Sequence, residues 1–139
     1  MPHDTAVILV VGLNRALLRH APRLSALAAR GVVHRLRPVL PAVTCSVQSS
    51  MLTGLPPHDH GIVGNGWYDR ALAEVHFWKQ SNKLVQGEKV WDTARRRDPS
   101  VTCANVCWWF NMNTSAAFTV SARRCGSARL YCCVPARSV

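Results

Sequence analysis

The chain has 139 residues, and its 17 lysines and arginines outnumber its 7 aspartates and glutamates to give a formal net charge of +10. This length suits one domain with a buried core. No internal repeat and no apolar stretch of membrane-spanning length occurs, and the short apolar run near the N-terminus lacks the basic lead-in of a secretory signal. We therefore expect a cytoplasmic protein with reduced thiols and no membrane partner.

The first forty residues predict a strand, a helix and a second strand. Residues 7–11 are continuously apolar and are followed by Gly12, which is typical of a buried strand in a parallel sheet. Residues 22–29 carry apolar side chains at helical spacing, and Gly31 ends that helix. Residues 32–39 then return as a strand.

The later part of the chain continues the alternation of helices and strands. We expect a helix at 45–52, a loop at 56–66, a short strand at 74–78, a helix at 89–97 and a buried strand at 101–109. Alternation of this kind predicts an α/β fold with a mostly parallel sheet and right-handed crossovers.

Thr44 stands at the start of the helix at 45–52, behind Pro38 and Pro41, which favour an extended approach. The unpaired N–H groups and the dipole of a helix start favour phosphate, and a hydroxyl beside them can attack phosphorus. Because Thr is also a common N-cap residue, spacing alone leaves two interpretations of Thr44, a cap and a nucleophile. Cys45 is a weaker candidate, a thiol with a pKa lowered by the helix start but without a histidine base nearby.

A spaced motif begins just before this threonine. It reads Pro41-Ala-Val-Thr44, then the helix, then Thr53-Gly54-Leu55-Pro56-Pro57-His58-Asp59-His60-Gly61-Ile62-Val63-Gly64-Asn65. This pattern resembles that of the nucleotide pyrophosphatase/phosphodiesterase (type I phosphodiesterase) branch of the alkaline phosphatase superfamily. The resemblance covers most of residues 6–116, and its anchors stand at fixed spacing, which makes it more specific than a short signature.

The resemblance implies a fold, a chemistry and site residues. The chain would form the N-terminal portion of an alkaline-phosphatase-like three-layer fold, and it would act on a phosphate-ester or nucleotide substrate with two zinc ions as cofactors. Thr44 would be the catalytic nucleophile and a zinc ligand, and Asn65 would donate a hydrogen bond to a phosphate oxygen. His60 falls on a histidine that is structural in the family, so the neighbouring His58 and Asp59 are not expected to join it around a metal ion.

Two departures from the family pattern bear on catalysis. The family usually places a zinc-binding Asp immediately before the glycine that ends the first strand, and this chain has Val11 there. Its other zinc ligands lie far downstream of the nucleophile, in enzymes several times longer than this chain. Thr44 is therefore the only family-matched metal ligand, and we expect a metal-dependent hydrolase that is incomplete and inactive as written. The alternative is a non-catalytic, truncated or pseudogene-like chain, or one that keeps a phosphate pocket without metals.

Composition changes after residue 116 and divides the chain into a partial domain at 1–116 and a basic, Cys-rich tail at 117–139. Cys125, Cys132 and Cys133 lie in this tail together with four arginines, and no acidic residue follows Asp98. We expect a frameshifted or disordered end. The spacing of the cysteines does not match the paired pattern of structural zinc sites.

The basic charge leaves nucleic-acid binding as a third and weaker hypothesis. Four of the net positive charges fall in the tail, and the remaining arginines are dispersed along the chain. The aromatic cluster at 108–110 would suit base stacking, but no recognisable nucleic-acid motif accompanies it. We expect no specific nucleic-acid partner.

Overall fold

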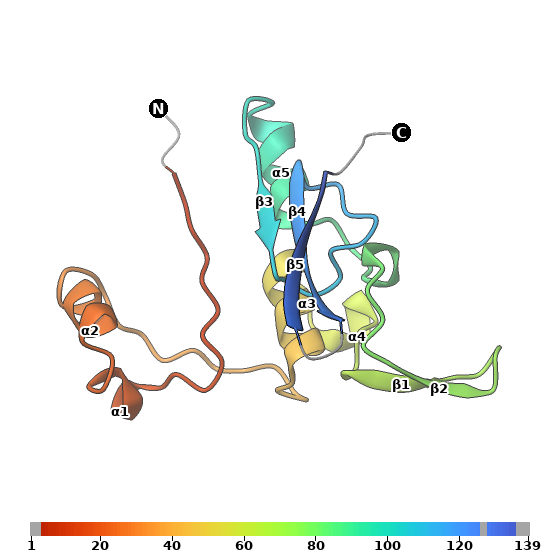
Figure 1. The fold of residues 1–139 in the computed structure, drawn as a ribbon, viewed down its shortest axis with the longest axis horizontal. Helices are drawn as coiled ribbons and strands as arrows, with labels where there is room; N and C mark the ends of the chain where they lie inside the picture. The colour runs from red at the N-terminus through yellow and green to blue at the C-terminus, as the bar shows by residue number, and fades with distance from the viewer. Residues whose placement is uncertain (1–3, 126–127, 136–139) are drawn as a thin grey trace. The chain divides into compact units, whose positions relative to one another are not determined.

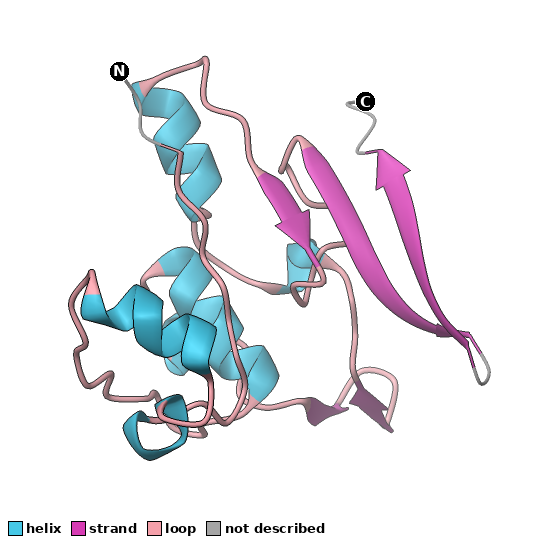
Figure 2. Cartoon of the chain, turned by 60° about the vertical axis from the view of Figure 1, so that its left-hand side comes forward, coloured by secondary structure: helices cyan, strands magenta, loops and turns pink. Residues whose placement is uncertain are grey.

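The computed structural model describes residues 4–125 and 128–135. The chain divides into two compact units, Met1–Arg37 and Pro38–Val139, which are described separately below. Helices and strands are mixed along the chain, in agreement with the α/β class (Figures 1 and 2). None of the helices in the described residues has the length and apolar character that crossing a membrane requires.

The first unit contains two short helices, α1 (Arg15–Leu18) and α2 (Pro22–Ala29). Asn14 caps α1 by accepting a 3.0 Å hydrogen bond from the N–H of Leu17, and the hydroxyl of Ser25 donates to the carbonyl of Leu18 across the two helices. α2 begins with its proline at the first helical position and spans the residues that the sequence predicts.

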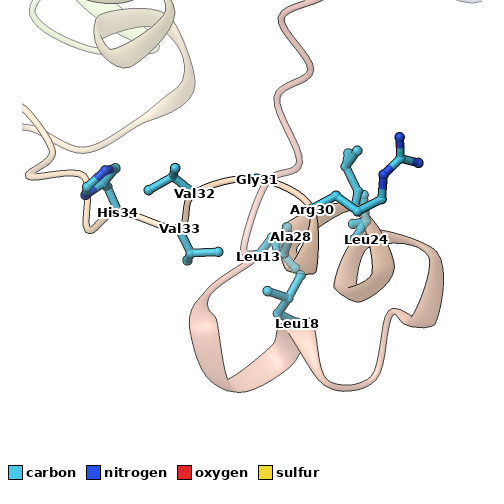
Figure 3. Close-up of a pocket in the computed structure, with 10 residues that line it drawn as sticks. Leu13, Leu18, Leu24, Ala28, Arg30, Gly31, Val32, Val33 and His34 are labelled. Atoms are coloured by element: carbon cyan, nitrogen blue, oxygen red, sulfur yellow. The ribbon is translucent and has the colours of Figure 1, made fainter.

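This unit contains an open apolar cavity of about 520 Å³, and Figure 3 shows residues that line it. Leucines of both helices, among them Leu18 and Leu24, line it together with residues 32–34.

The strand predictions for 7–11 and 32–39 are wrong, because neither segment pairs with a strand. Ile8, Val11 and Val32 are 78%, 81% and 78% exposed. A parallel strand needs neighbours for its backbone and covering layers on both faces, and these segments have neither among the described residues.

The second unit contains α3 (Thr44–Thr53), α4 (Pro57–His60) and the hairpin of β1 (Gly66–Asp69) and β2 (Glu74–Phe77). A short 3-10 helix, η1 (Asn82–Leu84), and α5 (Val90–Arg97) follow. The predicted helices at 45–52 and 89–97 and the short strand at 74–78 are confirmed to within one residue at each end. α4 is a single turn inside the segment predicted as a loop.

The sheets in the described residues are small and mixed. β3 (Ala104–Val106) pairs in parallel with β4 (Phe118–Cys125), and β4 pairs antiparallel with β5 (Ala128–Pro135). The predicted strand at 101–109 therefore shrinks to the three residues of β3, and a mostly parallel sheet is not found in the part of the chain described. Within the predicted tail, 118–125 and 128–135 are strands, and 126–127 and 136–139 lie outside the described residues.

Two apolar clusters hold the second unit together. The first contains Cys45, Ile62, Val85 and Phe110, and Trp109 packs against it. The second contains Leu52, Trp91 and Ala116. Because α3 contributes Cys45 to one cluster and Leu52 to the other, this helix is fixed at both ends.

Candidate functional site

The N-terminus of α3 brings the candidate nucleophile into a half-buried position. Val43 is the N-cap residue, with extended backbone angles, and Thr44 is the first helical residue. Neither side chain caps the helix, so the capping interpretation of Thr44 is wrong. The hydroxyl of Ser46 donates to the carbonyl of Pro41 at 2.8 Å, which ties the approach segment to the first turn.

Asn65 lies at this same helix start, although twenty residues of chain separate it from Cys45. Its side-chain Oδ1 accepts a 3.0 Å hydrogen bond from the backbone N–H of Cys45. A backbone N–H can only donate, so the atom facing it is the amide oxygen, and the Nδ2 group of Asn65 is left as a donor. The structure thus brings together the two site residues that the sequence predicts, Thr44 and Asn65.

His60 holds the loop between α3 and Asn65 in place. Its ring is fully buried, Nδ1 accepts from the N–H of Ile62 at 3.1 Å, and Nε2 lies 2.9 Å from the hydroxyl of Ser50 on α3. Because Nδ1 accepts a hydrogen bond, the neutral ring carries its proton on Nε2, and this N–H donates a hydrogen bond to the hydroxyl oxygen of Ser50. Burial lowers the pKa of His60, which favours this neutral form.

The Ser50–His60 pair is therefore not a nucleophile and its base, since the nitrogen facing the hydroxyl is a donor. The observed contacts give His60 a structural position, as the family resemblance implies. His58 and Asp59 are exposed, and their side chains lie 3.5 Å apart, whereas the ring of His60 is buried.

Cys45 is buried, and burial raises the pKa of its thiol to about 11. The interpretation of Cys45 as a reactive thiol with a lowered pKa is therefore wrong. Desolvation of the thiol outweighs the effect of the helix start, because Cys45 is packed in the first apolar cluster.

Sequence reasoning missed Gln48 and Trp109 as parts of this region. The side-chain oxygen of Gln48 on α3 accepts a 2.7 Å hydrogen bond from the backbone N–H of Trp109. The indole N–H of Trp109 donates to the carbonyl of Lys79, and its ring meets that of Trp78 edge to face with centroids 4.9 Å apart. The only sequence signal was the spacing of Gln48, one helical turn after Thr44.

Zinc does not fit the residues described. No group of three or more His, Cys, Asp and Glu side chains comes together in 4–125 and 128–135 in a way that could hold a metal ion. Thr44 stands without a second family-matched ligand, and position 11 carries the exposed side chain of a valine. What the described residues offer instead is a hydroxyl, an amide donor and the N–H groups of a helix start, a set suited to an anion.

Known proteins share this sequence pattern. The sequence profile of a family described as type I phosphodiesterase/nucleotide pyrophosphatase matches residues 5–135. The human ectonucleotide pyrophosphatase/phosphodiesterase family member 1 is 36% identical over 64 residues, which cover 43% of this chain and 7% of the human protein. An uncharacterized pyrophosphatase/phosphodiesterase of Schizosaccharomyces pombe is 34% identical over 84 residues, 55% of this chain and 17% of its own length.

The chain thus spans less than a fifth of the length of these relatives. The match at 5–135 includes the motif from Pro41 to Asn65 and the elements that carry the candidate site. The chain belongs to the type I phosphodiesterase/nucleotide pyrophosphatase family.

Proposed function

We propose that this chain provides the phosphate-binding and nucleophile-bearing part of a metal-dependent phosphodiester or pyrophosphate hydrolase. The observation that carries the proposal is the hydrogen bond from Cys45 N–H to Asn65 Oδ1, which joins the two ends of the family motif. In the proposed site, the hydroxyl of Thr44 and the Nδ2 of Asn65 act together at this helix N-terminus. A phosphate-ester or nucleotide substrate is the partner that this arrangement suits.

Each residue has a separate role in the proposed site. The Cys45 N–H is already bonded to Asn65, so the remaining N–H groups in the first turn of α3 and the Nδ2 of Asn65 would hold phosphate oxygens, and the Thr44 oxygen would attack phosphorus. His60 keeps the loop that carries Asn65 in register with α3 through Ser50. No step is assigned to zinc, because the described residues do not form a ligand set.

The isolated chain is expected to bind phosphate but not to turn over. Thr44 is its only family-matched metal ligand, and the carboxylate usual at position 11 is replaced by valine. The alternative is a chain of the same family that is wholly non-catalytic. The missing metal ligands support this alternative as well.

We further propose that the boundary at 116/117 marks a change of reading frame, and that the protein is cytoplasmic. The arginine- and cysteine-rich composition after residue 116 supports the first point. Sequencing of the gene around that boundary tests it: a single-base shift that restores Asp- and His-rich sequence is the expected result, and an open frame without one would contradict it.

Calorimetric titration with inorganic phosphate tests the function itself. The unaltered chain should bind phosphate, and Asn65→Asp should weaken binding by about tenfold or more, because it replaces a donor to a charged group with a like charge. Binding that Asn65→Asp leaves unchanged would contradict the proposal. Hydrolysis of p-nitrophenyl thymidine monophosphate with added zinc is expected to be absent. Robust turnover that Thr44→Ala abolishes would confirm the hydrolase and overturn only the prediction of inactivity.

A further inference from the structure

Gln48 lies one turn after Thr44 on α3, so the two side chains share a side of the helix. Side chains on a helix point back toward its N-terminus, which directs Gln48 toward the turn that carries Thr44. The residue is only 7% exposed, an unusual burial for a glutamine. Such a polar side chain needs partners for both ends of its amide.

One end of this amide has its partner in the protein. The 2.7 Å bond from the backbone N–H of Trp109 fixes the side-chain oxygen, because only an oxygen can accept there. Among the described residues, the Nε2 group of Gln48 has no hydrogen-bond partner. Some unpaired side-chain atoms in this part of the chain are completely enclosed by protein, and Nε2 is not one of them. It is therefore a donor that a ligand or solvent can reach.

The acceptor end is held by a rigid segment. Trp109 is fixed through its indole bond to the Lys79 carbonyl, and the carbonyl of the next residue, Phe110, accepts a 2.9 Å bond from the side chain of Asn82. Phe110 and Cys107, on either side of Trp109, adopt positive φ values of 55° and 54°. Non-glycine residues are strained in this region, and such strain persists at sites where the surrounding contacts impose it.

Gln48 and Asn65 thus share one arrangement. In each, a backbone N–H donates to the amide oxygen, which leaves the amide NH₂ group as a donor. Gln48 is on α3 one turn after Thr44, and Asn65 is bonded to the first turn of the same helix. We propose that Gln48 is a second amide donor of the phosphate site, which binds a phosphate oxygen through Nε2. This inference rests on the proposed phosphate-binding function and extends it by one substrate-binding residue.

The variant Gln48→Glu separates this role from a structural one. A glutamate keeps an oxygen for Trp109 N–H but replaces the donor with a negative charge, so the chain should keep its fold while phosphate binding falls by about tenfold or more. Gln86→Glu is the matched control, because Gln86 is an exposed glutamine of the same unit. This substitution adds the same negative charge at a different loop. Its binding of phosphate should equal that of the unaltered chain.

Calorimetry with inorganic phosphate, together with circular dichroism of each variant, gives the readout. Loss of binding in Gln48→Glu with an unchanged spectrum, and none in Gln86→Glu, supports the inference. Equal losses in the two glutamate variants, or none in Gln48→Glu, would overturn it. If Gln48→Glu alters the spectrum, Gln48→Met is measured in its place. It removes the donor without adding charge but also removes the acceptor of Trp109 N–H, so weaker binding supports the inference only with an unaltered spectrum, and unchanged binding would overturn it.

The outcome also separates this inference from the proposed function. If Asn65→Asp weakens phosphate binding and Gln48→Glu does not, the phosphate site stands and the role of Gln48 is refuted. If the unaltered chain binds no phosphate, both are refuted.

Discussion

The backbone N–H of Cys45 donates to the side-chain oxygen of Asn65 at 3.0 Å, so the end of a long loop is bonded to the first turn of α3. The side-chain amide of Asn65 therefore has two roles, one for each of its polar atoms, and substitutions at this position can separate them. The oxygen stabilises the helix start, and the Nδ2 group is the proposed phosphate donor. Asn65→Asp is therefore expected to raise stability while it weakens phosphate binding, whereas Asn65→Ala should lower both.

Asn65→Ala should lower the free energy of unfolding by about 0.5–1.5 kcal/mol, the net contribution of a typical hydrogen bond. Asn65→Asp keeps the acceptor and adds a negative charge at a helix N-terminus, which should stabilise by about 0.3–1 kcal/mol. Urea denaturation of the three proteins measures both changes. An aspartate variant less stable than the alanine variant would contradict this account of the bond.

The pH dependence of stability should report the buried ring of His60. Its pKa is lowered in the folded protein from the usual 6.5, chiefly by burial, so the unfolded chain binds a proton first as pH falls. The stabilisation is complete above pH 6.5, is lost as pH falls from there toward the folded pKa, and changes no further below it.

Urea midpoints from about pH 8 to about pH 5 measure this loss. His60→Gln keeps a donor for Ser50 and removes the titrating ring, so the component assigned to His60 should disappear. His58→Gln, which changes an exposed histidine two residues away, should retain it. A pH profile that His60→Gln leaves intact would show that other groups cause the loss.

The thiol of Cys45 should resist alkylation in the folded chain. Burial raises its pKa to about 11, and the side chain is 1% exposed, whereas Cys107 is exposed. Iodoacetamide labelling near neutral pH, followed by peptide mass spectrometry, should modify Cys107 well before Cys45, and the difference should vanish in urea. Labelling of Cys45 at the rate of Cys107 under native conditions would contradict the observed burial.

Gly66→Ala should disrupt the hairpin that begins beside Asn65. A Cβ atom at this position would lie 2.8 Å from the backbone carbonyl of His76 and 2.4 Å from the ring of Phe77. A backbone atom cannot move aside as a flexible side chain can, so we expect a loss of about 1–3 kcal/mol in unfolding free energy. Gly31→Ala is the control, because its Cβ would meet only ordinary contacts and its stability should change little.

The local elements of this protein follow from its sequence to different extents. Apolar residues at helical spacing predict α2 with the bounds that the structure has, and the predicted helices at 45–52 and 89–97 match α3 and α5 to within one residue at each end. The segments at 7–11 and 32–39 are predicted as strands from their apolar residues but do not form strands. A helix satisfies its hydrogen bonds within one segment, whereas a strand depends on neighbours that local sequence does not specify.

The candidate site, like the fold, follows only in part from the sequence. Residue types and fixed spacing, together with the family motif, identify Thr44 and Asn65, and the sequence alone places Thr44 at a helix start. Only the tertiary structure shows that Asn65 bonds to Cys45, that Cys45 is buried, and that Gln48 turns its oxygen to Trp109. Hydrogen-bond direction and burial arise from packing between distant segments, and no local pattern encodes which end of an amide that packing leaves free.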